Sequence, residues 1–156
     1  MIRKMQKEDE EIFFDLTDLF YASDAVMHPI PQKYHVDAFK EIIRSNVYID
    51  GYIFEVKGKP VGYAITTKTF SHEAGGITLW IDEIYVLKGY RSMGLGKEFF
   101  NFLQTSIDFS IARLRLEVES DNERAIILYK EMGFEKLEYA QMFKDRIKKE
   151  EFYDLE

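Results

Sequence analysis

Hydrophobic side chains recur with a helical period in four parts of the chain. Spacings of four, seven and eight residues after Ile12 put three further apolar side chains on the same helix face. Leu95, Phe99 and Phe102 repeat the pattern later in the sequence. The pattern predicts helices over residues 7–21, 36–43, 94–108 and 122–132.

Shorter apolar runs between these segments predict strands. A Lys-Gly-Lys-Pro turn at residues 57–60 separates two such runs and indicates a hairpin. Residues 77–87 are almost continuously apolar, as expected of a strand buried at the centre of a sheet. Strands are predicted at residues 1–5, 52–56, 61–70, 77–87 and 113–119, with two final strands at 134–143 and 151–155.

The order of these elements, β-α-α-β-β-β-α-β-α-β-β, predicts a mixed sheet of the α/β class. The length of 156 residues, with 46% hydrophobic and 31% charged residues, suits one globular domain over residues 1–156. No apolar run approaches the ~20 residues that span a bilayer, and the charged start of the chain lacks a signal-peptide core. These features predict a cytoplasmic protein that has no membrane partner.

Composition narrows the chemistry further. The sequence has no cysteine, which excludes disulfides, a thiolate nucleophile and a cysteine-based zinc site. Its three histidines are scattered and form no metal-ligand motif, so we expect no metal. The net charge of -7 disfavours nucleic acid and favours a cationic partner. An acidic surface that only aids solubility is the alternative.

The most informative segment is Tyr-Arg-Ser-Met-Gly-Leu-Gly-Lys at residues 90–97, which follows a predicted buried strand and opens a helix. Gly94 and Gly96 let the backbone approach a ligand closely, and a helix start presents free N–H groups. Those donors and the positive end of the helix dipole suit a pyrophosphate. The spacing matches neither the Rossmann nor the P-loop signature. An ordinary strand-to-helix turn is the alternative.

Residues 81–86, Ile-Asp-Glu-Ile-Tyr-Val, and the loop after them resemble the central motif of the GNAT acetyltransferases. That family has an acidic-apolar strand followed by an R/Q-x-x-G-x-G/A loop, and this region has some similarity to spermidine/spermine acetyltransferases. A second motif follows, with Asn122, Ala125 and Tyr129 on a helix and Gly-Phe after it. The resemblance covers nearly the whole chain. It implies the GNAT acyl-CoA N-acyltransferase fold, a mixed sheet of about six to seven strands flanked by four helices.

The resemblance implies that acetyl-coenzyme A binds where the central strand and the next parallel strand splay apart. The end of the central strand would hold the pantetheine arm, and the loop amides would hold the pyrophosphate. Asn122 would bond the pantetheine, or serve only as a helix cap. The implied cofactor-binding residues are Ile84, Tyr85, Val86, Arg91, Ser92, Met93, Gly94, Leu95, Gly96, Lys97, Asn122 and Ala125.

Direct attack of an amine on the thioester carbonyl, in a ternary complex, is the reaction that the resemblance implies. Such an attack needs no protein nucleophile, which fits a chain without cysteine. The N–H of Val86 would stabilise the oxyanion that develops. Tyr129 would protonate the leaving thiolate as general acid, or it is only a core aromatic.

A carboxylate, acting directly or through water, would accept the proton of the incoming ammonium. Asp82 and Glu83 are the two candidates, and the sequence does not choose between them. Neighbours on a strand point to opposite faces, so at most one of them should reach the acceptor unless a bulge intervenes. Either acid could instead pair with Arg113 or Arg115 on the neighbouring strand.

The expected function is transfer of an acetyl group from acetyl-CoA to a primary amine on a small molecule or a protein. The acidic net charge favours a cationic acceptor, whose identity the sequence does not give. An acyl-CoA-binding sensor or assembly protein without turnover is the alternative. A longer acyl donor stays open, as does a homodimer formed through the C-terminal strands, as in many GNATs.

Overall fold

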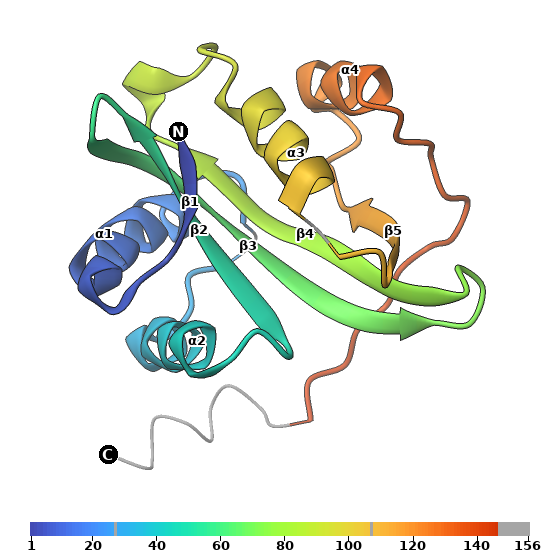
Figure 1. Cartoon of the computed structure of the whole chain (residues 1–156), viewed down its shortest axis with the longest axis horizontal. Coiled ribbons are helices and arrows are strands. Elements are labelled where there is room, and N and C mark those ends of the chain that lie inside the picture. The colour runs from blue at the N-terminus through green and yellow to red at the C-terminus, as the bar shows by residue number, and fades with distance from the viewer. Residues whose placement is uncertain (27, 107, 147–156) are drawn as a thin grey trace.

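A mixed sheet is the centre of the computed structural model, which describes residues 1–26, 28–106 and 108–146 (Figure 1). The described strands lie in the order β1-β2-β3-β4-β5, with neighbours antiparallel except for β5, which runs parallel to β4. Their bounds are β1 (Ile2–Lys4), β2 (Ile49–Val56), β3 (Lys59–Ser71), β4 (Gly76–Val86) and β5 (Ile111–Leu116).

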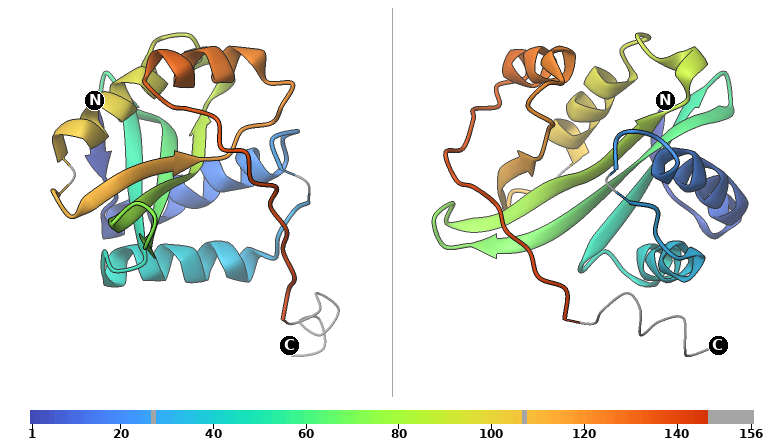
Figure 2. Two further views of the ribbon diagram at one scale, coloured as in Figure 1. Left: turned by 90° about the vertical axis from the view of Figure 1, so that its right-hand side faces the viewer. Right: turned by 180° about the vertical axis from the view of Figure 1, so that it is seen from behind.

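Helices pack on both faces of this sheet, as the two further views in Figure 2 show. Because successive strand residues point to opposite sides, Ile53 joins a core with α1 and α2, and its neighbour Phe54 joins a core with α3. No helix among the described residues is long and apolar enough to cross a membrane. The helices are α1 (Glu10–Tyr21), α2 (Gln32–Arg44), α3 (Leu95–Ser106) and α4 (Glu123–Glu131), with 3-10 turns η1 (Lys7–Asp9) and η2 (Lys88–Tyr90).

The predicted helices are confirmed, and α2 differs most in its bounds. It begins at Gln32, four residues before the predicted start, because its first turn is mainly polar and carries no apolar period. The predicted hairpin turn between β2 and β3 is also confirmed. Lys57 and Gly58 have φ angles of 51° and 76°, the left-handed pair that a tight two-residue hairpin turn requires.

Three strand predictions need correction or stay open. Residues 134–143 form no strand, because no described strand lies alongside to accept their backbone hydrogen bonds. The described sheet therefore has five strands rather than six to seven. Residues 151–155 lie outside the described residues. The central strand is less buried than predicted, since β5 pairs with β4 only as far as Ile81 and the rest of β4 is partly exposed.

A β-bulge interrupts the pairing of β3 with β4. Ile65 pairs with Glu83, but the next β3 residue, Thr66, pairs with Ile81. Asp82 is therefore an extra residue in β4 with no partner of its own. Such a residue bends its strand and changes the direction of the side chains that follow. The bulge lies at the level where β5 leaves β4.

Candidate active site

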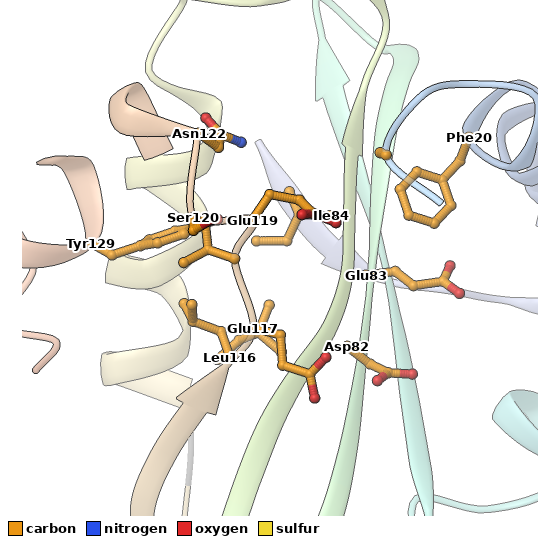
Figure 3. Close-up of a pocket in the computed structure, with 13 residues that line it drawn as sticks. Phe20, Asp82, Glu83, Ile84, Leu116, Glu117, Glu119, Ser120, Asn122 and Tyr129 are labelled. Carbon is orange, nitrogen blue, oxygen red and sulfur yellow. The ribbon is translucent and has the colours of Figure 1, made fainter. Parts of the chain in front are cut away.

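A pocket opens where β4 and β5 separate. In the part of the chain that the structure describes, the last register pair of the two strands is Ile81 with Leu116. The pocket has a volume of about 440 Å³ and lies between the second half of β4 and the segment that leads from β5 to α4 (Figure 3). Its lining consists of Phe20, Ala25, Ile81, Asp82, Glu83, Ile84, Leu116, Glu117, Val118, Glu119, Ser120, Asn122 and Tyr129.

The end of β4 presents backbone groups to this opening. The Leu87 N–H donates to the Val61 carbonyl of β3 at 2.8 Å. Bonded and non-bonded pairs alternate along an antiparallel ladder, so the N–H and C=O groups of Ile84 and Val86 point away from β3. The Val86 carbonyl accepts a hydrogen bond of 2.9 Å from Nε of Arg91. The remaining groups can bond an extended ligand arm as they would bond an added strand.

Asp82 and Glu83 both line the pocket. Figure 3 shows their carboxylates on the same side of β4, the side on which Phe20 lies. Regular alternation would have sent these neighbours to opposite faces. The bulge at Asp82 is the exception, and it brings both predicted base candidates to one cavity.

Glu83 is held at both of its oxygens. The Tyr21 hydroxyl donates to Oε1 and the Tyr63 hydroxyl donates to Oε2, each at 2.6 Å. Burial raises the pKa of the Glu83 carboxyl above its ordinary value, while the two phenol donors pull it back. Tyr63 is wholly buried, so this carboxylate is fixed by the interior of the protein. Neither oxygen of Glu83 is free of a donor.

Asp82 differs from its neighbour in its hydrogen bonding and exposure. Its side chain is exposed at the pocket, and it makes no hydrogen bond or ion pair with any described residue. Desolvation by the walls of the pocket raises the pKa of the Asp82 carboxyl above its ordinary value, and the nearby Glu117 carboxylate raises it further. A carboxylate with free oxygens and a raised pKa is suited to accept a proton.

The predicted alternative, in which these acids pair with arginines of the neighbouring strand, is wrong. Arg113 lies 3.8 Å from Glu73 in the β3–β4 turn. The Arg115 guanidinium lies 4.3 Å from the centroid of the Trp80 ring. Both arginines lie on the part of β5 that pairs with β4, and the acids lie beyond it.

Tyr129 is both a packing residue and a lining residue. Its ring packs edge-on against Phe100 at 5.7 Å and against Phe134 at 6.0 Å. Figure 3 shows the same ring reaching the pocket from the side opposite to the acids. Its hydroxyl has no hydrogen-bond partner among the described residues. Burial raises the pKa of the phenol, so the hydroxyl stays protonated at neutral pH.

The loop between η2 and α3 presents a row of backbone donors. Within the described chain, no backbone carbonyl accepts from the amides of residues 92–97, and the first such bond joins the Glu98 N–H to the Gly94 carbonyl at 2.9 Å. Gly94 has a φ of 78°, and a Cβ placed there would meet nothing within 4 Å. The loop is therefore open to a ligand. Its free amides and the helix dipole favour an anion.

Arg124 belongs to this region, although no motif predicted it. Its Nη2 donates to Oγ of Ser92 at 2.7 Å, which joins the start of α4 to the loop. Arg91, which the sequence did predict, turns back along β4 to the Val86 carbonyl. Two arginines therefore flank the amides in an otherwise acidic protein.

The position of Asn122 is compatible with both roles that the sequence left open, a helix cap and a ligand contact. Its Oδ1 accepts the Ala125 N–H at 3.2 Å, so it caps α4, and its side chain also lines the pocket. The side chain of Leu95 is buried in the core. The Tyr85 ring packs against Phe20 on the α1 side of the sheet. At Leu95 and Tyr85, therefore, only the backbone can face a ligand.

Several lining residues were not predicted from the sequence. Glu117, Glu119 and Ser120 lie beyond the end of β5. The alternating pattern had predicted a half-buried strand as far as Glu119, but β5 ends at Leu116 where it separates from β4. Tyr21 and Tyr63 reach Glu83 from elements far away in the sequence. No group of three or more potential metal ligands occurs among the residues that the structure describes.

The comparisons with known proteins agree with this geometry. The model of the acetyltransferase (GNAT) family matches residues 11–134, which include β2 to β5 and all four helices except the first residue of α1. The chain belongs to this family. The family predicted from the two sequence motifs is confirmed.

Individual relatives are more distant. Thialysine N-epsilon-acetyltransferase from Bos taurus is 30% identical over 95 residues, which make up 57% of this chain and 55% of the relative. The match thus spans about half the length of that protein. A protein of Clostridium difficile 630, described as a possible acetyltransferase, has a TM-score of 0.78 at 22% identity, over 95% of this chain and 98% of its own.

A second solved structure has the same fold. The aminoglycoside N-acetyltransferase AAC(6')-Iy, in complex with CoA, has a TM-score of 0.76 at 18% identity. The similarity covers 94% of this chain and 95% of that one. At such identities the two structures establish the fold, and the chemistry depends on the residues of this chain.

Proposed function

We propose that this chain is an N-acetyltransferase that moves the acetyl group of acetyl-CoA to a primary amine. The observation that carries the proposal is the split between β4 and β5. It opens onto the acid-lined pocket, and the end of β4 leads through η2 into the loop with free amides. A donor with an extended arm and a phosphate group suits this combination.

The residues present fit acetyl-CoA, which supplies a thioester-activated acetyl group when bound. The backbone groups of Ile84 and Val86 that face the split are suited to an extended arm with amide groups. The amides of residues 92–97 are suited to a pyrophosphate, with Arg124 close by. Asn122 lines the pocket between these two regions and keeps its amide nitrogen for a further bond.

Two groups divide the proton transfers. Asp82 accepts a proton from the acceptor ammonium, directly or through water, because its oxygens have no other partner among the described residues. Tyr129 lies across the pocket and donates a proton from its free hydroxyl to the departing thiolate. Glu83, fixed by two phenols, contributes a negative charge that favours an ammonium over a neutral amine.

The pocket favours a small cationic amine as the acceptor. Asp82, Glu83, Glu117 and Glu119 place four carboxylates in its lining, and no lysine or arginine lies among the described lining residues. An ammonium entering this field is attracted, and an anion is repelled. The relative named for thialysine also takes its name from an amine, which supports this class of acceptor.

Calorimetry with a matched pair of glycine variants tests the donor site. Gly94→Asp places a side chain and a negative charge against the pyrophosphate, so we expect CoA affinity to fall at least ~100-fold. Gly75→Asp is the control, because Gly75 has a similar φ of 73° and equally open surroundings but lies in the β3–β4 turn. The control should bind CoA like the wild type. A wild type that does not bind CoA, or equal losses in both variants, would contradict the proposed site.

Other expectations stay predictions. These are one domain over residues 1–156, a cytoplasmic location, a homodimer, and acetyl rather than a longer acyl group as the transferred unit. The family model covers residues 11–134 and does not test them.

A further inference from the structure

Glu83 has two hydroxyl donors, and the fold holds them in different ways. Tyr63, which donates to Oε2, lies on β3 and is wholly buried. Tyr21, which donates to Oε1, is the last residue of α1 and is only half-buried. Helix ends fray, because no further turn holds the final one in place. The position of Tyr21 therefore depends on side-chain contacts, and the bond to Oε1 is the less securely held of the two.

His35 supplies one of these contacts from α2. It is 4% exposed, whereas His28 and His72, the other two histidines of the chain, are exposed. Its ring lies edge-on to the Tyr21 ring, with 5.2 Å between the centroids and 73° between the planes. The His35 Nε2 is 3.9 Å from Oδ1 of Asp18, which is beyond hydrogen-bond length. Burial lowers the pKa of His35, so the ring is neutral at pH 7 and packs against Tyr21 as an aromatic.

The phenol donors distinguish Glu83 from Asp82, the neighbouring acid of the pocket. Both acids line the cavity, and Figure 3 shows their carboxylates on one side of β4. A hydrogen bond to a carboxylate stabilises the charged form and makes it a weaker proton acceptor. Without the bond from Tyr21, only the oxygen that faces the buried Tyr63 would keep a donor. Oε1 would then be as free as the oxygens of Asp82.

We propose that Tyr21, held by His35, is a positioning residue that keeps Glu83 out of the proton transfer and leaves that step to Asp82. When the Tyr21 hydroxyl is absent, Glu83 becomes a second base. An N–H bond of the acceptor ammonium then breaks, its proton goes to Oε1 of Glu83, and its electron pair stays on nitrogen for attack on the thioester. The inference rests on the proposed acetyltransferase function and adds the residues that select between its two acids.

An Asp82→Asn background tests this selection, because it removes the normal base. Adding Tyr21→Phe, which keeps the ring and its packing, should raise kcat/KM at least about fivefold above Asp82→Asn alone, as a partial recovery of general-base catalysis. Adding Glu83→Gln as well should abolish the recovery. Tyr63→Phe in place of Tyr21→Phe should give no recovery, because the oxygen that it frees faces the interior.

The sign of the effect separates positioning from packing. If Tyr21 only stabilises the pocket, its variant loosens the site and lowers activity further in the Asp82→Asn background. If Tyr21 restrains Glu83, activity rises, and kcat/KM again increases with pH at the acidic end of its profile, because a carboxylate must ionise to accept a proton. No recovery with Tyr21→Phe, or a recovery that survives Glu83→Gln, overturns the proposal.

Variants of His35 in the same Asp82→Asn background test its part. His35→Ala should raise kcat/KM at least about twofold, because a displaced Tyr21 hydroxyl bonds Glu83 for only part of the time. His35→Phe keeps an aromatic ring against Tyr21 and should give little recovery. His72→Ala changes an exposed histidine in the β3–β4 turn and should give none. Equal activities for His35→Ala and His72→Ala overturn the part assigned to His35. Absence of CoA release by the wild type with every amine would instead overturn the proposed function itself.

Discussion

The Tyr63 hydroxyl donates a 2.6 Å hydrogen bond to Oε2 of Glu83, from a side chain that is wholly buried. The Tyr21 hydroxyl donates to the other oxygen, so both carboxylate oxygens of Glu83 accept a hydrogen bond. Adjacent Asp82 has no such partner in the described structure. The two neighbouring acids therefore differ in the proposed mechanism, in which Glu83 is a fixed charge and Asp82 is the proton acceptor.

Glu83 should make the protein less stable as the pH rises. Its pKa in the folded state lies above the ordinary value, so between the ordinary and the raised pKa the folded chain holds more protons than the unfolded chain. Stability from this group is then full at acid pH and is lost as the pH rises through the raised pKa. Glu83→Gln removes the dependence, and its amide can still meet both phenols. We expect the variant to be at least as stable as the wild type at pH 7, measured by urea unfolding across a pH series.

The control for that series is Glu131→Gln, which changes an exposed glutamate at the end of α4. It should leave the pH profile of stability as it is in the wild type. A Glu83→Gln protein that loses stability at pH 7 but not at pH 4 would contradict the direction of the shift.

The protonation state of Asp82 should control the acidic side of the pH profile of kcat/KM. Its carboxyl must be ionised to accept a proton, and its pKa is raised, so kcat/KM should increase with pH through a value above the ordinary aspartate range. Asp82→Asn should lower kcat/KM by ~10²-fold or more and abolish that limb. Glu117→Gln should move the limb to lower pH, because it removes the carboxylate that raises the pKa. A limb that stays in place in both variants would exclude Asp82 as the base.

Tyr129→Phe should separate catalysis from packing. If the hydroxyl protonates the leaving thiolate, kcat should fall by ~10²-fold or more. CoA affinity and the melting temperature should change little, since the ring still packs against Phe100 and Phe134. Steady-state kinetics and thermal melts of the Phe variant check both halves. An unchanged kcat would mean that water or another acid supplies the proton.

Added salt should weaken the binding of a cationic acceptor to the pocket. The four pocket carboxylates attract cations over a distance, and screening shortens that range as ionic strength rises. Between about 50 and 500 mM NaCl, KM for a dication should rise several-fold. The rise for a monoamine should be smaller. Equal salt sensitivity for mono- and diamines, or none for either, would show that the acidic lining plays no part in recognition.

Local patterns predicted most of the fold and the family. The helical periods located four helices, and the loop at residues 90–97 lies at a helix start as predicted. Both motifs depend on spacing within one short continuous segment, which sequence reports directly. Asn122 and Tyr129 therefore lie at the pocket that the second motif implied.

The contacts that give the site its character depend on partners far apart in the chain. The bulge at Asp82 exists only through the register of β4 against β3, which the apolar run of β4 does not specify. Tyr21 is 62 residues away from Glu83, and Arg124 is 32 residues away from Ser92. The strand predicted at residues 134–143 failed for the same reason, since sequence does not report which segments lie side by side. A run predicts a strand only where a neighbouring strand is available, and none lies there in the described sheet.

The measurement that tests the central claim most directly is turnover with product identification. The purified chain, acetyl-CoA and a panel of amines would be followed by CoA release, and each acceptor would be examined by mass spectrometry for one added acetyl group. We expect CoA release above the uncatalysed rate with at least one cationic amine, matched by its N-acetylated product, and loss of both with Gly94→Asp. CoA binding without release for any amine in the panel would contradict the account and favour an acyl-CoA-binding protein without turnover.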